Sequence, residues 1–480
     1  NVDQLTNPQA AVIASILRSP GLYDPKFKEG NAERLANRFE YVKNNMIEAG
    51  WLDEKAAANM KLPTVAPRST SGQLSGPKGH IIEAVQKELA KLGFSQDQLL
   101  VGGLVIKTTL DQKAQQSAVD AVNKFYPSNA PKDLRIGLVA IRPGTGEILA
   151  LYGGRDYLER QLNDATQSIT QAGSTFKPFV YATAFEQGNG PCDTRVDKYI
   201  RHEYEENGEI QVWEPKNANR VFTNEPITLR QAMAMSINSI AVQLTLECGP
   251  KNVAKMAKKL GIKSPLQPVP SIGLGTNDVS LWELTASYAP FINGGYKIEP
   301  ILVAKITDRK GKVLAQFKQK KIRVLSPETA WLMSYMFKGT IEEYQGTSQA
   351  LFQYQNLVYK NDVGGKTGTS NNYSDGWYIG ITSGLIGGVW VGAEDRSVHF
   401  KTSATGEAIR TALPIYGLFM EKVLTDHNSS IKASYYPKEP IPIEKPHNCR
   451  GNTSRKLSIS LIDSLEYLPE FVDTSVVELE

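Results

Sequence analysis

The sequence of 480 residues has little cysteine, no long apolar run and almost no net charge. The three cysteines, Cys192, Cys248 and Cys449, are widely spaced and odd in number, so neither a disulfide framework nor a zinc cage is expected. The longest apolar runs, 11–18 and 384–392, are much shorter than the roughly 18 residues that a membrane-spanning helix needs. A net charge of +4 does not predict binding to nucleic acid, although a diffuse positive charge could help at an anionic cell surface.

Histidine is also scarce. None of the five histidines lies in a G-x-S-x-G context or an H-E-x-x-H pair, so a Ser-His-Asp triad has no support and surface or structurally satisfied histidines are the better explanation. The glycine-rich turn GTGEIL at 144–149 lacks the strand-then-helix setting and the G-K-[ST] ending of a phosphate loop. A serine nucleophile in this chain would need a base other than histidine.

The order of apolar patterns predicts an α/β fold. Residues 134–154 form a pattern of two apolar strands joined by Pro-Gly-Thr-Gly, which is typical of a hairpin, and strands return at 363–393. Mostly helical sequence lies between them, at 170–340, and a further helix is expected at 406–424. We therefore expect an antiparallel sheet built from both ends of a domain and flanked by helices on both faces.

Changes in composition divide the chain into four segments. Residues 1–60 have helical periodicity, and 61–131 begin with a Ser/Thr/Pro/Gly-rich stretch that predicts a linker module with a short α/β part. Residues 132–428 contain the expected sheet and its helices. Four prolines fall close together in 429–480, for which a small appended module or a poorly ordered tail is expected. Because the chain begins at Asn1 rather than Met, it is expected to be a fragment.

A serine followed by a lysine three places on supplies the first candidate site. The pattern S-x-x-K occurs at Ser75, Ser174 and Ser429, and by itself it is a weak signal. Only Ser174 opens an apolar helix, predicted at 171–190, where Lys177 can lie against the serine hydroxyl and, if desolvated, accept its proton. A serine that caps the helix beside a lysine that extends to solvent explains these two residues equally well.

Two further motifs favour the catalytic interpretation. Ser236 and Asn238 form an S-x-N motif 62 residues after the candidate nucleophile, whereas a second S-x-N, at Ser370, is explained by turn chemistry. The only K-[ST]-G in the chain begins at Lys366 and leads into an apolar strand region. A strand end with a solvated lysine would explain K-T-G alone. Together the three motifs, in this order, predict a serine nucleophile assisted by lysine.

With these motifs the chain resembles the penicilloyl-serine transferase superfamily, and within it the transpeptidase portion of a class A (bifunctional) penicillin-binding protein. The likeness extends over roughly residues 134–425 and includes the stretches IRPGTGEILALYGG, AGSTFKPFVYATAFEQG and GGKTGTSNNYSDGWYIG. It implies the fold of D,D-transpeptidases and serine β-lactamases.

Residues 1–60 are similar to the closing helices of the family's glycosyltransferase domain, whose earlier part, with its catalytic glutamates, is not in this sequence. The resemblance therefore implies glycan polymerisation for the parent protein but not for this fragment. It also implies a membrane anchor upstream, on the extracytoplasmic side of the bacterial cell membrane, and possible contact with the cell-wall and division machinery.

The resemblance implies a mechanism when it is carried over to the matching positions. Ser174 would attack the carbonyl of a D-Ala–D-Ala bond in a peptidoglycan stem peptide, and Lys177 would take the serine proton. The backbone N–H groups of Ser174 and Thr369 would hold the oxyanion. Ser236 and Lys366 would pass a proton to the departing D-alanine. An amine from a neighbouring stem peptide would then resolve the acyl-enzyme and form a cross-link.

The same resemblance implies the substrate-binding residues. Asn238 would bond the substrate's peptide amide, while Thr367 and Thr369 would hold its terminal carboxylate near the lysine of K-T-G. Gly368 would let the substrate backbone approach closely. β-Lactams would acylate the same serine, and neither a metal nor an organic cofactor is expected.

Three rival functions share some of these motifs. A β-lactamase would need a deacylating water held by an E-x-x-x-N segment, which is not found at a suitable place between Ser236 and Lys366, and the chain is too long for a bare lactamase. A D,D-carboxypeptidase shares all three motifs and differs only in its acceptor. A β-lactam sensor would be expected to carry membrane helices and a signalling domain, whereas this sequence carries a glycosyltransferase remnant.

Overall fold

The computed structural model describes residues 5–449, except 18, 24, 26–29, 65–73, 127–129, 132, 207–208, 427 and 441. The chain divides into two compact units, Asn1–Ser75 and Gly76–Glu480. The predicted linker segment at 61–131 therefore falls partly in each unit, and its larger part folds with the second one.

The first unit is helical. A small apolar core forms between its two longer helices and includes Ala11, Phe39 and Leu52. Asp53 begins the last helix by accepting a hydrogen bond of 2.7 Å from the backbone N–H of Ala56. None of the described helices in either unit is long and apolar enough to cross a lipid bilayer. The helices of this unit are α1 (Asn7–Leu17), α2 (Pro20–Tyr23), α3 (Asn31–Glu48) and α4 (Glu54–Ala58).

The second unit is built around a five-stranded antiparallel sheet with the strand order β14-β15-β16-β2-β3. The predicted hairpin forms β2 (Arg135–Ile141) and β3 (Ile148–Tyr152), and the later strands are β14 (Gly364–Thr369), β15 (Asp375–Ile381) and β16 (Ile386–Gly392). β16 pairs with β2 in full register, so two segments far apart in sequence meet at the centre of the sheet. β14 is an edge strand.

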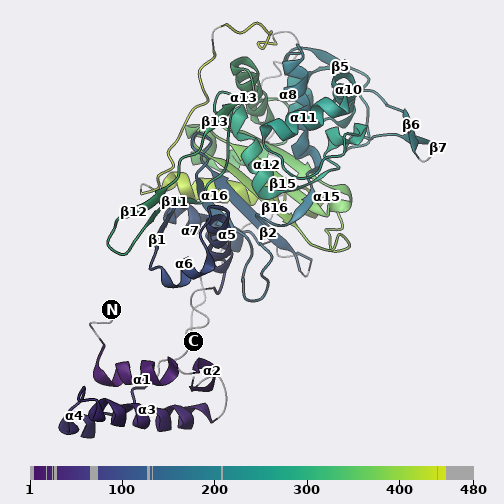
Figure 1. The fold of residues 1–480 in the computed structure, drawn as a ribbon. Helices are drawn as coiled ribbons and strands as arrows, with labels where there is room; N and C mark the ends of the chain where they lie inside the picture. Colours follow the sequence, from purple (N-terminus) through teal and green to yellow (C-terminus); the bar gives the residue numbers. More distant parts are fainter. Residues whose placement is uncertain are drawn as a thin grey trace, which may run out of the picture. The chain divides into compact units, whose positions relative to one another are not determined.

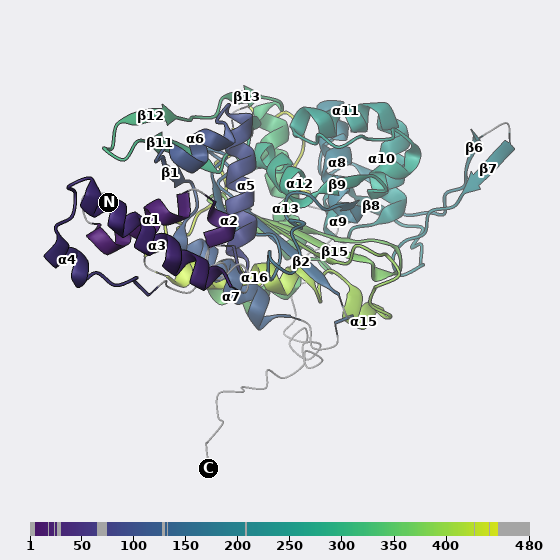
Figure 2. The same ribbon diagram turned by 60° about the horizontal axis from the view of Figure 1, so that its bottom comes forward.

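Helices cover both faces of this sheet, as Figures 1 and 2 show. Side chains alternate along the strands: in β15, Tyr378 packs into the core on one face, while Trp377 and Ile379 pack into the core on the other. The first face is covered by α7 (Gln112–Lys124) and α16 (Ala412–Thr425). The second is covered by α8 (Lys177–Glu186), α12 (Leu281–Ser287) and α13 (Pro327–Glu342). The predicted antiparallel sheet with helices on both faces is confirmed.

The helix predicted at 406–424 differs from the observed one in where it begins. α16 starts at Ala412, and a separate short helix, α15, covers Ser403–Gly406. Pro414 explains the late start, because proline is tolerated in the first helical turn but breaks a helix interior. Starting at Ala412 places Pro414 in that first turn.

A smaller sheet of three strands, with the order β1-β11-β12, lies beside α5 and α6. The hairpin β6–β7 projects from the opposite end of the unit (Figures 1 and 2). The remaining helices are α5 (Lys78–Lys91), α6 (Gln96–Val101), α9 (Leu229–Ala234), α10 (Asn238–Cys248), α11 (Pro250–Leu260) and α14 (Gln355–Lys360). The remaining strands are β1 (Val105–Thr108), β4 (Ile169–Gln171), β5 (Thr194–Val196), β6 (His202–Glu206), β7 (Glu209–Trp213), β8 (Pro226–Thr228), β9 (Asp278–Ser280), β10 (Tyr296–Ile298), β11 (Val303–Thr307), β12 (Val313–Gln316) and β13 (Lys321–Arg323).

A disulfide between Cys192 and Cys449 fastens an extended C-terminal segment to the second unit, while Cys248 is free and buried. Sequence spacing did not predict this bond, because its cysteines are 257 residues apart and only the tertiary fold brings them together. In the same segment, the Pro437 carbonyl oxygen accepts a hydrogen bond of 3.2 Å from the indole N–H of Trp331 in α13. The part of the predicted C-terminal module beyond residue 449 lies outside the described residues.

Candidate active site

Ser174 lies in a 3₁₀ turn, Gly173–Phe176, that leads directly into α8 at Lys177. The turn is fixed by apolar packing, since Phe176 and Phe179 are fully buried. Lys177 is also fully buried, whereas Ser174 is partly exposed. Among the described residues, the Ser174 hydroxyl has no hydrogen-bond partner, and Lys177 Nζ bonds to Ser236 and Asn238 instead.

Strand β14 approaches the Ser174 turn very closely. A Cβ at Gly368 would lie 2.8 Å from the carbonyl oxygen of Ala172, and a Cβ at Gly173 would lie 3.3 Å from the carbonyl oxygen of Thr369. Gly173 also has a φ of 55°, which glycine adopts readily. Glycines at both positions therefore let the backbone of Thr369 lie beside the backbone of the Ser174 turn.

The three motifs meet at the hydroxyl of Ser236. Lys366 Nζ lies 2.8 Å from Ser236 Oγ, and Lys177 Nζ lies 3.1 Å from the same oxygen. Lys177 Nζ also donates to the Ser236 carbonyl oxygen and to Asn238 Oδ1, both at 2.6 Å. Ser236 has a φ of 59°, a left-handed conformation that is uncommon for serine and typical of functional sites.

Both lysines are held without an acidic partner. Each has no exposed surface, and neither forms an ion pair with any described residue. Burial, and next the nearby Lys366, hold the pKa of Lys177 well below its ordinary value of 10.5. Burial lowers the pKa of Lys366 to about 7. The Lys366 amine is therefore available in its neutral form near neutral pH, and burial favours the neutral form of Lys177 as well.

A polar network fixes the S-x-N segment at the start of α10. Asn217 Oδ1 accepts hydrogen bonds from the backbone N–H groups of Asn238, at 3.0 Å, and Ser239, at 3.1 Å. Asp197 Oδ1 accepts in turn from Asn217 Nδ2, at 2.8 Å, and from Ser239 Oγ, at 2.6 Å. Asn238 Nδ2 donates to the carbonyl oxygen of Lys216 at 2.8 Å. Both ends of the Asn238 amide are thus engaged.

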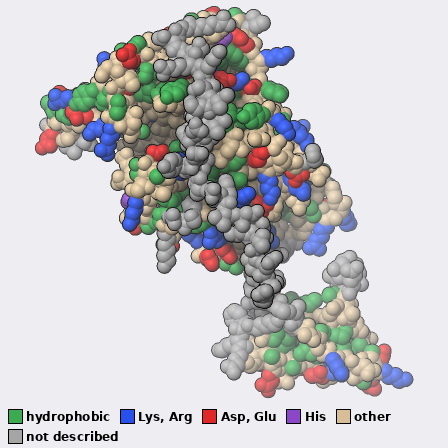
Figure 3. Space-filling model, turned by 180° about the vertical axis from the view of Figure 1, so that it is seen from behind, with side chains coloured by type: hydrophobic (Ala, Val, Ile, Leu, Met, Phe, Trp, Pro, Cys, Tyr) green, Lys and Arg blue, Asp and Glu red, His purple; other side chains and the backbone are tan. Residues whose placement is uncertain are grey.

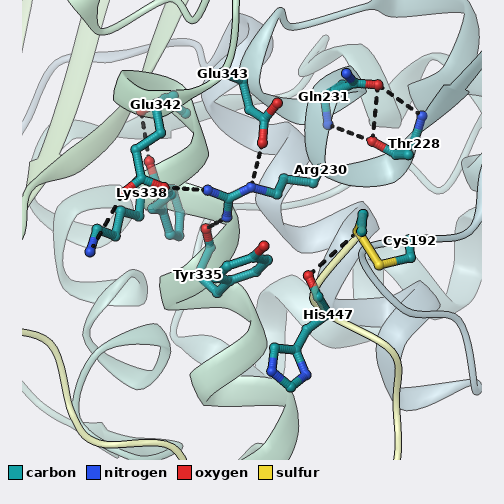
Figure 4. A network of polar contacts seen from close by, with 12 residues as sticks. Cys192, Thr228, Arg230, Gln231, Tyr335, Lys338, Glu342, Glu343 and His447 are labelled. Carbon is teal, nitrogen blue, oxygen red and sulfur yellow. Dashed lines mark hydrogen bonds and ion pairs between the residues drawn. A yellow bond between two sulfur atoms is a disulfide. The ribbon is translucent and has the colours of Figure 1, made fainter. Parts of the chain in front are cut away.

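Arg230 joins α9, which leads to Ser236, to α13. Its side chain is 5% exposed, and its guanidinium forms ion pairs of 2.6 Å with both Glu342 and Glu343. Figure 4 shows these pairs together with a hydrogen bond to the Tyr335 carbonyl. The guanidinium carbon also lies 3.7 Å from the centre of the Tyr335 ring, a cation–π contact.

Helix α13, to which Arg230 is bonded, also contacts β14. Thr340 Oγ1 accepts a hydrogen bond of 3.3 Å from the Gly365 backbone N–H, and a Cβ at Gly364 would collide with the carbonyl of Phe337. α13 therefore fixes the positions of both α9 and β14. This arrangement holds Ser236 opposite Lys366.

The C-terminal segment packs against two aromatic side chains of α13, Trp331 and Tyr335. The His447 ring meets Trp331 edge-on at 5.0 Å and Tyr335 at 6.0 Å between ring centres. His447 lies two residues before Cys449, so the disulfide seen in Figure 4 holds it there.

The threonines of β14 point differently from its lysine. Lys366 and Gly368 pair with Ile379 and Trp377 and share their face of the sheet, whereas Thr367 and Thr369 alternate to the other side. The threonine side chains therefore leave β14 on the side away from the Lys366 amine. Thr369 Oγ1 accepts a hydrogen bond of 3.1 Å from the backbone N–H of Ala408, which leaves its proton available to donate.

The alternative serines have local explanations. Ser370 Oγ donates to Asp375 Oδ2 at 2.6 Å, as expected for turn chemistry. Ser429 Oγ accepts a hydrogen bond of 3.1 Å from the backbone N–H of Ile431, just after α16. Among the described residues, no group of three or more His, Cys, Asp or Glu side chains is placed to hold a metal ion.

Comparison with known proteins identifies the family of this chain. The family model of the penicillin-binding protein transpeptidase domain matches residues 136–391. The chain belongs to this family. The match begins in β2 and ends in β16, so it spans the sheet and all three motifs.

Two curated relatives are similar in sequence to this penicillin-binding protein. It is 32% identical over 423 residues to penicillin-binding protein 2D of Bacillus subtilis (strain 168), which covers 88% of this chain and 59% of the relative. It is 33% identical over 339 residues to penicillin-binding protein 1A of Aquifex aeolicus (strain VF5), which covers 70% of this chain and 43% of the relative. The chain thus spans about half the length of these relatives.

Two solved structures share the fold of this penicillin-binding protein. Penicillin-binding protein 1A from Haemophilus influenzae superposes with a TM-score of 0.74 at 22% identity, covering 89% of this chain and 82% of that one. The PonA1 protein from Mycobacterium tuberculosis in complex with penicillin V superposes with a TM-score of 0.66 at 24% identity, covering 79% and 100%.

Sequence reasoning missed Asp197, Asn217 and Arg230 of this penicillin-binding protein. Asn217 lies in the stretch WEPKNAN, and Arg230 lies six residues before Ser236, but neither belongs to a catalytic motif. A lone arginine within an apolar helix that precedes a catalytic motif is a usable signal, because a buried arginine must find partners. No sequence pattern marks Asp197.

Proposed function

We propose that this chain is the D,D-transpeptidase portion of a class A penicillin-binding protein, which cross-links peptidoglycan stem peptides through an acyl-enzyme on Ser174. The observation that carries the proposal is the contact of two buried lysines, Lys177 and Lys366, with the single hydroxyl of Ser236 beside the Ser174 turn. β-Lactams would acylate Ser174 and block the site. The penicillin V complex of the structurally similar PonA1 protein supports that expectation.

The hydrogen bonds of Lys177 can be made by a neutral amine that acts as a base. A neutral amine has two N–H donors and one lone pair. Two carbonyl oxygens, those of Ser236 and Asn238, lie 2.6 Å from Nζ and can accept both donors. The lone pair then remains to accept a proton from a hydroxyl, and the lowered pKa of Lys177, caused by burial and then by Lys366, favours this form.

The first half of the reaction forms the acyl-enzyme. Ser174 Oγ bonds to the carbonyl carbon of the penultimate D-alanine while Lys177 takes the hydroxyl proton. The backbone N–H groups of Ser174 and Thr369 stabilise the oxyanion. The peptide C–N bond then breaks, and the departing D-alanine amine receives a proton by way of Ser236 and Lys366.

The second half transfers the acyl group to an amine. The amine of a second stem peptide attacks the ester carbonyl, a new amide forms, and the proton it releases returns to the Ser174 hydroxyl. Asn238 uses its second Nδ2 proton to bond the donor peptide amide, and Thr367 and Thr369 hold the terminal carboxylate of the donor at the edge of β14. Gly368 lets β14 lie against the Ser174 turn, since any side chain there would enter that turn.

The test is a transfer assay with a donor peptide ending in D-Ala–D-Ala and a separate amine acceptor. The chain should form the cross-linked product, and Ser174→Ala should form none. Ser429→Ala, the same change in another S-x-x-K sequence of the chain, should leave the yield unchanged. Release of D-alanine without cross-linked product would identify a D,D-carboxypeptidase, and a stable adduct without turnover would identify a sensor.

The proposal extends to the parent protein by resemblance. Residues 1–60 would be the end of a glycosyltransferase domain, 61–131 an interdomain module, 132–428 the transpeptidase domain and 429–480 a small C-terminal module. An upstream membrane helix would hold the protein at the extracytoplasmic face of the cell membrane. There the cell-wall and division machinery would be potential partners.

A further inference from the structure

Positive charge is concentrated in one stretch of the second unit. Residues 305–323, KITDRKGKVLAQFKQKKIR, hold eight Lys and Arg against the single Asp308. Their net charge of +7 exceeds the +4 of the whole chain, so all other residues together carry −3. The stretch begins in β11, forms the hairpin to β12 and ends in β13. The mild total charge therefore hides a strongly basic patch.

The lysines of this stretch are solvated rather than paired. Lys312, Lys318 and Lys320 are exposed, and none of them forms an ion pair with any described residue. In Figure 3, Lys and Arg side chains gather at the end of the larger unit that carries β12, opposite the projecting β6–β7 hairpin. The charge thus lies on one accessible end of the unit.

The three-stranded sheet brings a further lysine into the patch. Lys107 in β1 lies directly opposite Lys305 in β11. The intervening Ile106 and Ile306 point the other way and pack with Leu89 of α5. Like charges directly opposite each other destabilise an antiparallel pair. An anionic partner over this face would attract both lysines and so offset their repulsion.

Exposed aliphatic side chains lie among the lysines. Val105 is 55% exposed, Val313 48%, Leu314 47% and Ile322 52%. A hydrated polyanion would gain nothing from these side chains. At a membrane interface, by contrast, lysines attract anionic headgroups while neighbouring aliphatic side chains enter the boundary with the acyl chains. The combination of charge and apolar surface therefore favours a lipid surface.

We infer that the exposed face of β1, β11 and β12, together with the chain from β12 to β13, docks on an anionic phospholipid surface. We call it the basic face. It contains none of the residues assigned to catalysis, so it is a second functional surface of the molecule. In a protein anchored at the membrane, this contact would fix the orientation of the transpeptidase unit above the bilayer.

The test is sedimentation of the 480-residue chain with lipid vesicles. The chain should bind vesicles of mixed phosphatidylglycerol and phosphatidylcholine, should not bind pure phosphatidylcholine, and should be released by salt. Each lysine at an anionic membrane contributes a factor of about five in affinity. The triple variant Lys312→Gln/Lys318→Gln/Lys320→Gln should therefore bind about 100-fold more weakly.

A matched variant separates this surface from general positive charge. Lys251→Gln/Lys255→Gln/Lys259→Gln removes the same charge from the exposed side of α11 and should weaken binding less than about fivefold. An equal loss in both triple variants would overturn the proposal. Penicillin labelling should be the same in all variants, which shows that each is folded.

Leu314→Ser distinguishes a lipid surface from an anionic polymer. The change should weaken vesicle binding several-fold, since a buried leucine side chain contributes apolar area, and should leave binding to soluble polyphosphate unchanged. If Leu314→Ser has no effect on vesicles and polyphosphate binds as tightly as they do, the partner is a polyanion and the lipid proposal is wrong.

Discussion

Replacing Lys366 by methionine should stabilise the protein while abolishing its activity. Burial lowers the pKa of Lys366 to about 7 from an ordinary value of 10.5. Between these values the unfolded chain binds a proton that the folded chain does not, so the contribution of Lys366 to the free energy of unfolding rises with pH. Below pH 7 the folded chain holds the protonated amine and bears the full cost of burying this charge. The difference between the two pKa values sets that cost at about 5 kcal/mol.

Two lost hydrogen bonds offset part of this gain. Lys366 donates to Ser236 Oγ at 2.8 Å and to the Thr367 carbonyl oxygen at 3.0 Å, and each bond contributes about 1 kcal/mol. Methionine has a similar length and fills the same space. The net expectation for Lys366→Met is a gain of about 3 kcal/mol at pH 7, which should shrink towards pH 10 and then reverse.

Urea unfolding at pH 7 and pH 10 measures this difference. The signal is tryptophan fluorescence, to which Trp377 and Trp390, buried in the sheet of the second unit, contribute. The control Lys251→Met changes an exposed lysine and should alter stability by less than about 0.5 kcal/mol at either pH. A Lys366→Met variant that is less stable than the parent at pH 7, or whose difference does not depend on pH, would refute the reasoning.

Three further predictions concern the groups that hold the site in place. Arg230→Ala should cost about 3 kcal/mol of stability by removing both ion pairs of this buried arginine and leaving Glu343 without its partner, and it should slow penicillin acylation at least tenfold. The more exposed pair removed by Arg195→Ala should cost under about 1 kcal/mol, and normal acylation by Arg230→Ala would limit that residue to stability. Gly368→Ala should slow acylation about 100-fold with modest loss of stability, because its Cβ would displace the Ser174 turn; near-normal acylation would contradict the close approach. Reduction of the disulfide should lower the thermal midpoint by opening a loop of 257 residues, worth about 2–4 kcal/mol, and an unchanged midpoint would show that the C-terminal segment adds no stability.

The sheet could be predicted because its signals are local. Apolar alternation and turn residues predicted the β2–β3 hairpin and the strands at 363–393, and sequence order then required an antiparallel arrangement. The motif positions could be predicted for the same reason, since each motif lies within a few residues. Their meeting at Ser236 Oγ depends on long-range packing; the family resemblance linked Ser236 to Lys366 but not to Lys177.

The supporting groups could not be predicted because their partners are remote in sequence. Asp197 lies 42 residues from Ser239, and Arg230 lies 112 residues or more from the two glutamates that it binds. The disulfide has the same character. Periodicity and motif spacing carry no information on contacts of this kind. Pro414 was a local signal, yet its effect on the start of α16 was not recognised.

The most direct test of the central claim is mass-spectrometric mapping of the residue to which penicillin attaches. The chain should carry one penicilloyl group, on Ser174, and Lys177→Ala should lower the rate of its formation by orders of magnitude. A group attached to Ser75, Ser429 or Ser236 instead would contradict the assignment of the nucleophile.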